Sequence, residues 1–390
     1  MKHILPVFAL VIALTVLFGL PAAVQAQGDM PPAGDASSGK PLCLPDVYLT
    51  DPQDCLALGP SQKLTELARK GITYPQRPLP AYRPDPGLAV SPVSLARINL
   101  PQNEGAPLYA TFEDAIAGNN PTRYIDPGEL RYVSYIAVRY HNDKPWIRVR
   151  SGEWMRASPV AYSGFQGLLF KRTPANNFGW IVDTAEVRSA PGYNSPKAGK
   201  TLYRENVVQI YAVEPMDRTD WFMIGPDQWV ERRYIRQVMV NTTPPEGATG
   251  DRWIEINLFE QTIAVYENRQ LVFATIIATG GDPFFTRPGL HQIYEKKELE
   301  TMSGAFEADR SDYYYLEDVP WTMYFDAKRA LHGAYWRAWF GYAGTHGCVN
   351  LSIGDSKWLF EWAQEGDWVY VWDPSGQTPT DPAFYGSGGA

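Results

Sequence analysis

The sequence predicts a mainly β, multidomain protein. At 390 residues the chain is long enough for about two or three domains. Short runs in which apolar and polar residues alternate, separated by turn segments, recur from about residue 96 to about residue 280. This pattern is typical of half-buried strands. Aromatic residues are also abundant, with 23 tyrosines and 13 tryptophans, and they favour strands.

The first 26 residues have the features of a secretory signal peptide. A short basic start precedes an almost wholly apolar run over residues 4–20, and small residues at Val24 and Ala26 precede a cleavage site. Residues 27–42 are rich in Gly, Pro, Ser and Ala, which predicts a disordered tether. We therefore expect an exported protein, in the periplasm or cell wall, with no retained membrane span. A retained anchor is the alternative.

Residues 43–95 are Pro-rich and contain two of the three cysteines, Cys43 and Cys55. Two closely spaced cysteines in an exported segment are expected to form a disulfide. A short helix is predicted from Ser61 to Lys70, but no function is predicted for this region. The third cysteine is then an odd thiol, and nucleophilic catalysis is one reason for an exported protein to keep a thiol free.

Residues 96–165 and 166–240 carry a degenerate internal repeat. Trp146 and Trp154 are eight positions apart, as are Trp221 and Trp229, and the two pairs are offset by 75 positions. Each pair follows a strand-like run, which predicts two small β-barrels. The pattern resembles bacterial SH3-like (SH3b) modules. The tryptophans are interpreted mainly as core residues, and binding of cell-wall glycan or peptide by these modules is the alternative.

Residues 241–251 form a polar, Pro- and Gly-rich interdomain linker. The segment 252–373 follows, and residues 374–390 are expected to form a disordered tail. Within 252–373 we predict a β-meander, then a helix, then a final strand. Their residues are Ile254–Leu258, Thr262–Tyr266 and Leu271–Thr279 for the meander, Gly354–Gln364 for the helix and Trp368–Trp372 for the strand.

The candidate catalytic residues lie between the predicted meander and the predicted helix. Two of the five histidines and one cysteine fall in the seventeen residues from His332 to Cys348. A free thiol with a pKa of about 8.5 is mostly protonated at neutral pH, and an imidazole can take its proton. Gly347 lets a backbone N–H approach a substrate carbonyl closely. The alternatives are a zinc site, which would need a fourth protein ligand, and an inert buried cysteine.

These residues carry a family resemblance. His332-Gly333, with Thr345-His346-Gly347-Cys348-Val349-Asn350, resembles the signature of the L,D-transpeptidase (YkuD-type) catalytic domain. Upstream, Thr286-Arg287-Pro288-Gly289 resembles the family's Thr-Pro-x-Gly turn with an added Arg. The segment Val319–Phe325 resembles the apolar run that leads to the first histidine. The resemblance covers residues 252–373, about a third of the chain, and implies a β-rich catalytic domain.

The resemblance implies roles for several residues. Cys348 would be the nucleophile and His332 the general base and acid, its second ring nitrogen held by the backbone near Gly333. His346 would orient the loop, and the backbone at Gly347 would contribute to an oxyanion hole. Candidate substrate-binding residues are Asn350, Thr345, Tyr324 and Trp321.

The implied activity is that of an exported L,D-transpeptidase. Cys348 would attack the carbonyl after the third residue of a peptidoglycan stem peptide and pass the acyl group to an amine. The products would be 3→3 cross-links or a protein attached to the wall. The alternatives are an L,D-carboxypeptidase of the same fold and a non-catalytic cell-wall-binding protein. An NlpC/P60-type peptidase is disfavoured, because there the Cys precedes the His in the chain.

Composition and charge restrict the classes of molecule that the protein could bind. The formal net charge of −8 and the absence of a basic stripe argue against nucleic acid as a partner. The predicted chemistry needs no cofactor and no metal. The segment Asp309–Asp318, with three tyrosines flanked by carboxylates, is interpreted either as a lid whose carboxylates meet a substrate ammonium or as an ordinary solvated loop.

Overall fold

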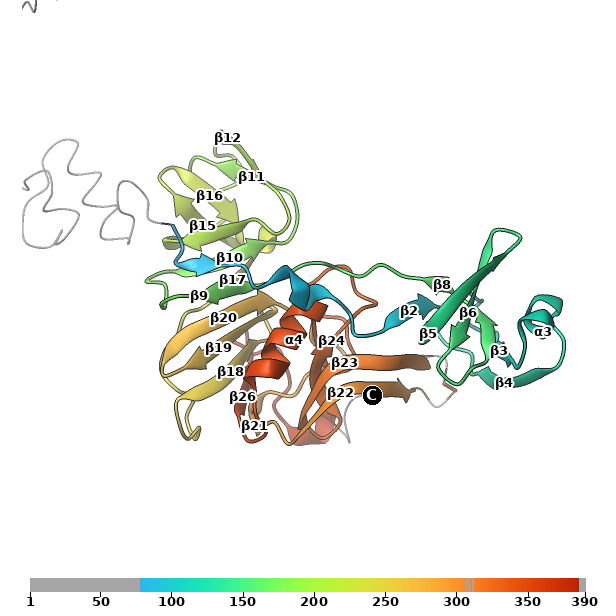
Figure 1. The fold of residues 1–390 in the computed structure, drawn as a ribbon. Helices are drawn as coiled ribbons and strands as arrows, with labels where there is room; N and C mark the ends of the chain where they lie inside the picture. Colours follow the sequence, from blue (N-terminus) through green and yellow to red (C-terminus); the bar gives the residue numbers. More distant parts are fainter. Residues whose placement is uncertain (1–77, 306, 308, 311, 386–390) are drawn as a thin grey trace, which may run out of the picture. The chain divides into compact units, whose positions relative to one another are not determined.

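The computed structural model describes residues 78–385 except 306, 308 and 311 (Figure 1). The predicted signal peptide, the tether, the Cys43–Cys55 disulfide and the helix Ser61–Lys70 lie outside the described residues. No helix in the described part is long and apolar enough to cross a membrane.

The prediction of a mainly β fold is confirmed. The described residues form four β-sheets and only two α-helices, α3 (Phe112–Ala117) and α4 (Ile353–Trp362). The predicted meander, helix and final strand of the C-terminal part are all present. Apolar residues at strand or helix spacing located these elements, although both faces of the meander strands are buried.

The first large sheet has seven strands, in the order β1-β9-β20-β19-β18-β26-β21. Strands β18, β19 and β20 are the antiparallel meander, and β26 runs parallel to β18. The bounds are Ala81–Tyr82 (β1), Leu168–Phe170 (β9), Arg252–Asn257 (β18), Thr262–Glu267 (β19), Gln270–Ile276 (β20), Gly289–Gln292 (β21) and Trp368–Trp372 (β26).

The second large sheet joins the C-terminal part to the upstream residues. Its main path is β25-β24-β23-β5-β6-β7-β3-β4, with β22 also paired to β23 and β2 paired to β5 and β8. The bounds are Ser94–Arg97 (β2), Ala106–Tyr109 (β3), Pro121–Ile125 (β4), Leu130–His141 (β5), Lys144–Val149 (β6), Trp154–Arg156 (β7), Ser158–Pro159 (β8), Glu295–Gly304 (β22), Tyr314–Asp326 (β23), Arg329–Gly333 (β24) and Val349–Leu351 (β25).

A core of aliphatic side chains lies between the two large sheets. It takes Ile254, Ile256 and Val369 from the first sheet, and Leu331 and Val349 from the second, all fully buried. Helix α4 begins at the N-cap Ser352, whose hydroxyl accepts from the N–H of Asp355 (3.1 Å). Since Leu331 and Val349 flank the predicted catalytic residues in sequence, this core fixes the strands that carry them.

Module 1, residues 96–165, has its own core. The small side chains Ala96, Ala106 and Ala157 and the larger Leu108 and Ile147 are all buried there, with five further apolar residues. Helix α3 begins at the N-cap Thr111 and ends at Gly118, which has a left-handed φ of 71°. One aromatic contact, between the rings of Phe112 and Trp154 with centroids 5.0 Å apart, holds this helix on the module.

Module 2, residues 166–240, is built from two smaller sheets. Their orders are β13-β10-β17 and β12-β11-β16-β15-β14. The bounds are Asn177–Ile181 (β10), Ala185–Arg188 (β11), Lys197–Leu202 (β12), Val207–Ile210 (β13), Ala212–Met216 (β14), Thr219–Gly225 (β15), Gln228–Glu231 (β16) and Ile235–Val238 (β17). A second set of aliphatic side chains around Val187 and Val230 forms its core.

The tryptophan repeat corresponds to a repeated strand pairing. Trp146 is opposite Arg156 in module 1, and Trp221 is opposite Glu231 in module 2, which is the same register moved by 75 positions. The turns match too. Residues 142 and 143 both have positive φ, and so do residues 217 and 218. Two consecutive positive φ values fit a tight hairpin turn, so both copies fold the same three-stranded meander.

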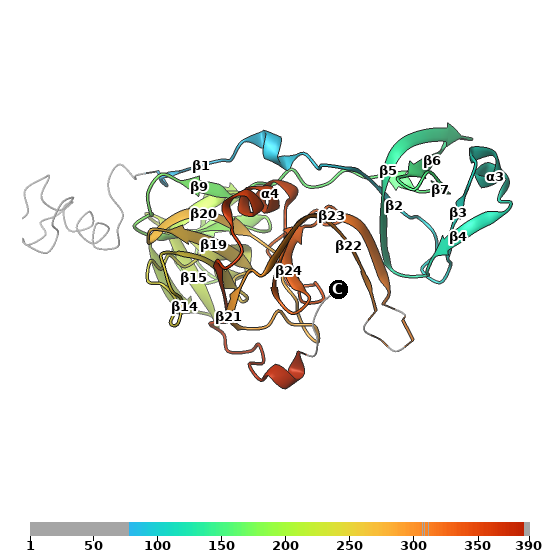
Figure 2. The same ribbon diagram turned by 60° about the horizontal axis from the view of Figure 1, so that its bottom comes forward.

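The modules share sheets with the C-terminal part. β5 of module 1 runs parallel to β23, with Leu130 opposite Tyr314, and β9 of module 2 pairs with β20. Figure 2 shows β22 and β23 as long curved strands. These pairings occupy strand edges that would otherwise be open. The linker 241–251 also contacts the C-terminal part, since Thr249 accepts from the Trp368 indole (3.0 Å).

Residues 374–385 differ from the expected disordered tail. Asp373 accepts hydrogen bonds from Ser375 and Thr378, which closes a turn. The chain then forms a short 3₁₀ helix (Pro382–Phe384), and Tyr385 is buried against the Arg329 guanidinium. The ring of Tyr385 thus packs on a cation of the C-terminal domain. The Pro- and Gly-rich composition of the tail does not predict this contact.

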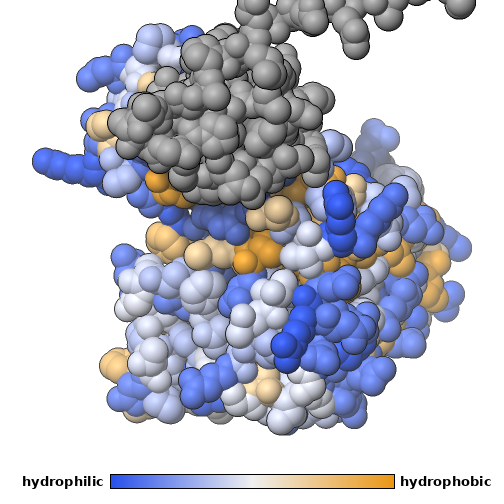
Figure 3. Space-filling model, turned by 90° about the vertical axis from the view of Figure 1, so that its left-hand side faces the viewer, coloured by the Kyte–Doolittle hydropathy of each residue, from blue (hydrophilic) through white to orange (hydrophobic). Residues whose placement is uncertain are grey.

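The face shown in Figure 3 is mainly hydrophilic, with hydrophobic side chains gathered in a band across its middle. Apolar residues that stay partly exposed beside the core of the first sheet include Leu79, Ala81 and Val207.

Candidate active site

Two parallel strands carry the predicted catalytic residues. On β24 and β25, His332 is opposite Asn350, and Gly333 is opposite Leu351. The backbone of Asn350 also exchanges two hydrogen bonds with Ala278 (2.8 and 3.0 Å) at the end of the meander. Cys348 comes directly before β25. The cysteine and the histidine are therefore held by strands in one sheet, although sixteen positions separate them.

The turn before Cys348 is fixed by its own hydrogen bonds. The hydroxyl of Thr345 donates to the carbonyl of Cys348 (2.6 Å), and the N–H of Gly347 donates to the same hydroxyl (3.2 Å). Gly347 has a φ of 111°, and a Cβ there would lie 3.2 Å from the Arg329 Nε. Only glycine adopts this conformation at low cost, so the turn requires the residue that the motif carries.

A buried threonine supports this turn from the meander side. Thr286 is fully buried, and its hydroxyl donates to the carbonyl of Gly347 (2.8 Å). The same hydroxyl accepts from the N–H of Gly280 (2.9 Å). Thr286 thus connects the loop after β20 to the residue before Cys348. It is the first residue of the Thr-Arg-Pro-Gly segment.

His332 is positioned as a neutral base. Its side chain is buried, and Nδ1 lies 3.3 Å from the carbonyl oxygen of Gly333. A carbonyl can only accept, so Nδ1 carries the proton in this contact and Nε2 keeps its lone pair. Burial lowers the pKa of His332 to about 4, with the hydrogen bond to Gly333 opposing the shift and the nearby Arg337 adding to it. At neutral pH the imidazole is therefore uncharged and able to accept a proton.

Cys348 is mostly buried, with 6% of its surface exposed, and its Sγ lies 3.8 Å from the carbonyl oxygen of Lys328. His346 lies between two aromatic rings, with centroid distances of 4.8 Å to Phe284 and 5.8 Å to Tyr314. Burial lowers the pKa of His346, while the carboxylates of Asp312 and Glu129 oppose the shift. The ring packing favours a positioning role for His346.

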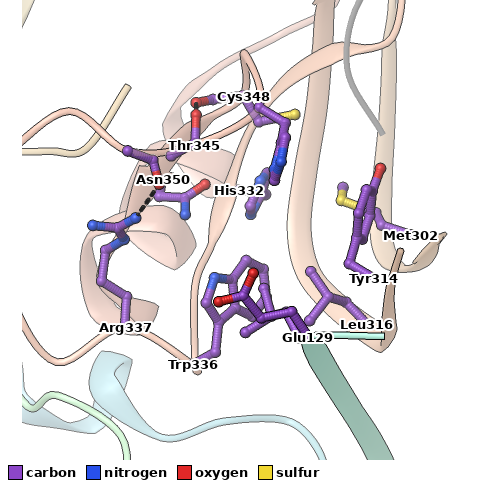
Figure 4. Close-up of a pocket in the computed structure, with 13 residues that line it drawn as sticks. Glu129, Met302, Tyr314, Leu316, His332, Trp336, Arg337, Thr345, Cys348 and Asn350 are labelled. Atoms are coloured by element: carbon purple, nitrogen blue, oxygen red, sulfur yellow. Dashed lines mark hydrogen bonds between the residues drawn. The ribbon is translucent and has the colours of Figure 1, made fainter. Parts of the chain in front are cut away.

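A cavity of about 300 Å³ opens at these residues (Figure 4). The predicted residues His332, His346, Cys348, Thr345 and Asn350 all line it. Tyr314 and Leu316 of the Asp309–Asp318 segment line it too. The sequence did not single out the remaining lining residues, which are Glu129, Leu130, Met302, Trp336, Arg337 and Gly344.

Two of the cavity residues are charged, apart from the histidines. Arg337 donates to the carbonyl of Gly344 (2.7 Å), and burial lowers its pKa. Glu129 is supplied by module 1. The cavity therefore has one cationic and one anionic side chain, together with a thiol and a neutral imidazole. Such a site can attack a carbonyl and bind a polar peptide.

The other predicted residues lie around the cavity. Gly333 is packed against α4 so closely that a Cβ would lie 2.6 Å from the Ser356 Oγ. Tyr324 stacks on Tyr294 at 6.1 Å, and burial raises the pKa of its hydroxyl, as do the charges of Glu300 and Cys348. Tyr324 therefore lies near the thiol without lining the cavity.

Trp321 is not brought to the cavity. It packs against Phe360 of α4, with ring centroids 5.4 Å apart. The carboxylates of the Asp309–Asp318 segment also find other partners. Glu317 accepts from the N–H of Ser134 (2.9 Å), and Asp318 accepts from its hydroxyl (2.6 Å). These two acids connect β23 to module 1, whereas Tyr314 of the same segment lines the cavity.

Within residues 78–385, as far as they are described, no group of three or more His, Cys, Asp or Glu side chains is placed to hold a metal ion.

Comparison with known families identifies the C-terminal part. Residues 251–371 match the family model described as the L,D-transpeptidase catalytic domain, YkuD. The match spans the meander, the catalytic strands, α4 and most of β26. It confirms the resemblance inferred from the His332 and Cys348 motifs. A search of curated protein sequences finds no significant match.

Solved structures similar to the chain include L,D-transpeptidases. One from Stackebrandtia nassauensis is 26% identical, covering 34% of this chain and 59% of that one, with a TM-score of 0.27. A variant from Enterococcus faecium is 26% identical, covering 31% and 50%, with a TM-score of 0.29. The E. faecium catalytic domain acylated by ertapenem is 27% identical, covering 32% and 100%, with a TM-score of 0.29. The chain thus spans between half and three fifths of the first two, and the assignment rests on the family model.

Proposed function

We propose that this chain, whose residues 251–371 form a YkuD-type L,D-transpeptidase catalytic domain, is a working transpeptidase with Cys348 as nucleophile and His332 as base. L,D-transpeptidases act on peptidoglycan peptides, which lie outside the cytoplasm. The proposal includes export through the N-terminal segment and action on stem peptides of the wall. The upstream modules are proposed as SH3-like β-barrels, a reading supported by their repeated register.

The observation that carries the proposal is the state of His332 beside the thiol. A buried, neutral imidazole with its free lone pair on Nε2 and a buried cysteine line one cavity. Figure 4 shows both side chains at the same end of that cavity. A structural histidine needs no such cavity, and an inert cysteine needs no base.

The proposed reaction has two halves. In the first, the Nε2 of His332 takes the thiol proton, and Sγ of Cys348 bonds to the carbonyl carbon of the donor peptide. The amide C–N bond then breaks, His332 returns the proton to the leaving amine, and a thioester remains. In the second half, the amine of an acceptor attacks the thioester. Its proton goes to His332, the C–S bond breaks, the Cys348 thiolate takes the proton from His332, and the new amide is released.

The oxyanion would be held by backbone N–H groups near Cys348. The N–H of Gly347 already donates to Thr345, at 3.2 Å, which is long for such a bond. We propose that this N–H turns toward the substrate oxygen as the tetrahedral intermediate forms. Asn350 and Thr345, which line the cavity, would contact the peptide.

The test is incubation of the purified protein with disaccharide-tetrapeptide muropeptides, followed by mass analysis of the products. Loss of the terminal residue with formation of a dimer supports transpeptidation. Loss of that residue without a dimer indicates the hydrolytic alternative. In parallel, intact-protein mass spectrometry after a carbapenem should show one adduct, located on Cys348. Unchanged muropeptides and no adduct would refute the enzymatic proposal and favour a wall-binding protein.

A further inference from the structure

The catalytic cavity is not completed by the catalytic domain alone. Glu129 and Leu130 of module 1 line it together with His332 and Cys348. They enter because β5 runs parallel to β23, with Leu130 opposite Tyr314. Figure 4 shows Glu129 beside Trp336, at the end of the cavity away from Cys348.

The backbone at Glu129 is held against β23. The N–H of Glu129 donates to the carbonyl of Tyr313 (3.0 Å). Gly128 approaches the same carbonyl so closely that a Cβ would lie 2.2 Å from its oxygen. A side chain at position 128 would therefore separate the two strands. The position of Glu129 is set by a backbone contact that only glycine before it permits.

The same loop is fixed from within module 1. Arg131 is 2% exposed, and its guanidinium donates to four backbone carbonyls at 2.7 to 3.4 Å. These carbonyls belong to Leu100, Pro101, Glu104 and Asp126. A buried guanidinium with four acceptors rigidifies the segments that it joins. Glu129, two residues before Arg131, is thus presented to the cavity from a fixed base.

The Glu129 side chain itself is exposed and has no hydrogen-bond or ion-pair partner among the described residues. It is the one carboxylate among the described residues that line the cavity. Of the lining residues that the structure describes, the one cationic residue outside the histidines, Arg337, is engaged with the Gly344 carbonyl. A carboxylate on a fixed backbone, with no hydrogen bond or ion pair to its oxygens among the described residues, is complementary to a cationic ligand group and repels an anionic one.

We propose that Glu129 is a specificity-determining residue, contributed by module 1, that binds a primary ammonium group on a side chain of the acyl-donor peptide. This inference rests on the proposed function. The ammonium belongs to the donor and not to the attacking acceptor, because a carboxylate stabilises the charged form of an amine and a nucleophilic amine must be neutral. Module 1 therefore takes part in substrate choice as well as in the fold.

The test uses three donor peptides that differ only at one side-chain amine, which is free, acetylated or succinylated. Release of the terminal residue gives kcat/KM for the full-length wild type, Glu129→Gln and Glu129→Lys. The matched control is Glu113→Gln, an exposed carboxylate on α3 of the same module. Alkylation of Cys348 by uncharged iodoacetamide reports whether the thiol is intact in each variant.

We expect the wild type to prefer the free-amine donor. Glu129→Gln should lose about 3- to 10-fold in kcat/KM on that donor, as for a partly solvated ion pair, and less than twofold on the acetylated one. Glu129→Lys should shift the preference to the succinylated donor. Glu113→Gln and all alkylation rates should equal those of the wild type.

Two results would overturn the inference while leaving the proposed function in place. One is an equal loss on free and acetylated donors, and the other is no loss on either, in a Glu129→Gln protein that still alkylates normally. A wild type that alkylates at Cys348 yet processes none of the three donors refutes the proposed function, and the role of Glu129 with it. Failure of the Glu129 inference appears only in the Glu129→Gln variant, whereas failure of the proposed function appears in the wild type. The two outcomes are therefore distinguishable.

Discussion

His332 and Asn350 are directly opposite each other on the parallel strands β24 and β25. This register places the imidazole next to the strand that follows Cys348. Leu331 on β24 and Val349 on β25 are buried in the core, which holds both strands in place. The proposed base and the proposed nucleophile are therefore held by packed strands. Catalytic groups held in this way keep their geometry without substrate.

The first prediction concerns the nucleophile. Cys348→Ala should abolish carbapenem acylation and muropeptide turnover. It should cost at most about 1 kcal/mol of stability, because only one sulfur atom is removed from a site that is 6% exposed. Urea unfolding and intact-protein mass spectrometry measure the two effects. Product formation by the folded variant would remove Cys348 from the mechanism.

The second prediction separates the two histidines. His332→Ala should slow acylation of Cys348 by about 10²- to 10⁴-fold, as expected for loss of a general base. His346→Ala should lose less, because its ring packs between Phe284 and Tyr314 and serves to position the turn.

The second prediction also fixes how the rate of Cys348 acylation depends on pH. Burial lowers the pKa of His332 to about 4, so the neutral base is present above that pH and is lost as the pH falls through it. The acid limb of wild-type acylation should lie near pH 4, well below the ordinary histidine pKa of about 6.5. If His346→Ala removes this limb and His332→Ala keeps it, the two roles are reversed.

Local pattern was sufficient to predict much of the catalytic domain. The alternation at Ile254 and Ile256 located β18, although both faces of that strand are buried, and the spacing of Trp358 and Trp362 located α4. The motif around Cys348 could be read because the nucleophile and its turn are contiguous in sequence. The tryptophan repeat likewise reflects one hairpin register used twice.

Contacts between distant segments could not be predicted in this way. Glu129 reaches the cavity through a parallel pairing with β23, and nothing local in module 1 signals that partner. For the same reason the sequence did not predict that Glu317 and Asp318, expected either in a lid or in a solvated loop, bind Ser134. Partners in a parallel pairing are distant in sequence, so a single sequence gives no register for them.

The third prediction tests the support of the catalytic turn. Thr286→Val keeps the shape of the side chain but leaves the N–H of Gly280 and the carbonyl of Gly347 without their buried partner. We expect about 2–4 kcal/mol of destabilisation and slower acylation of Cys348. Thr201→Val, at an exposed position of β12, is the control and should be neutral. Equal unfolding midpoints for both variants would show that the hydroxyl is dispensable.

The fourth prediction concerns Asp355, which is fully buried in the first turn of α4. It accepts from the N–H of Gly167 (2.8 Å) and the hydroxyl of Thr275 (2.6 Å), so it joins α4 to the start of module 2 and to β20. Asp355→Ala should destabilise the protein by about 2–4 kcal/mol, because the Gly167 N–H loses its acceptor.

Asp355 should also give the protein a pH-dependent stability. Burial raises its pKa to about 6, so the folded state holds the proton more tightly than the unfolded state. This contribution is complete below about pH 4 and is lost as the pH rises to about 6, for a total of about 3 kcal/mol. Asp355→Asn should lack that slope in urea unfolding between these pH values. Parallel slopes in both proteins would show that Asp355 does not titrate there.

The fifth prediction tests the contact between module 1 and β23. A Cβ at Gly128 would lie 2.2 Å from the carbonyl oxygen of Tyr313, so Gly128→Ala must push β5 away from β23. We expect about 1–3 kcal/mol of destabilisation and weaker processing of peptide donors, with little change in alkylation of Cys348 by a small neutral reagent. Gly164→Ala is the matched control, since a Cβ there meets no atom within 4 Å. If Gly128→Ala lowers alkylation as much as peptide turnover, the pairing with β23 shapes the catalytic strands themselves. If both glycine variants behave like the wild type, the strands adjust without cost and module 1 does not set the cavity wall.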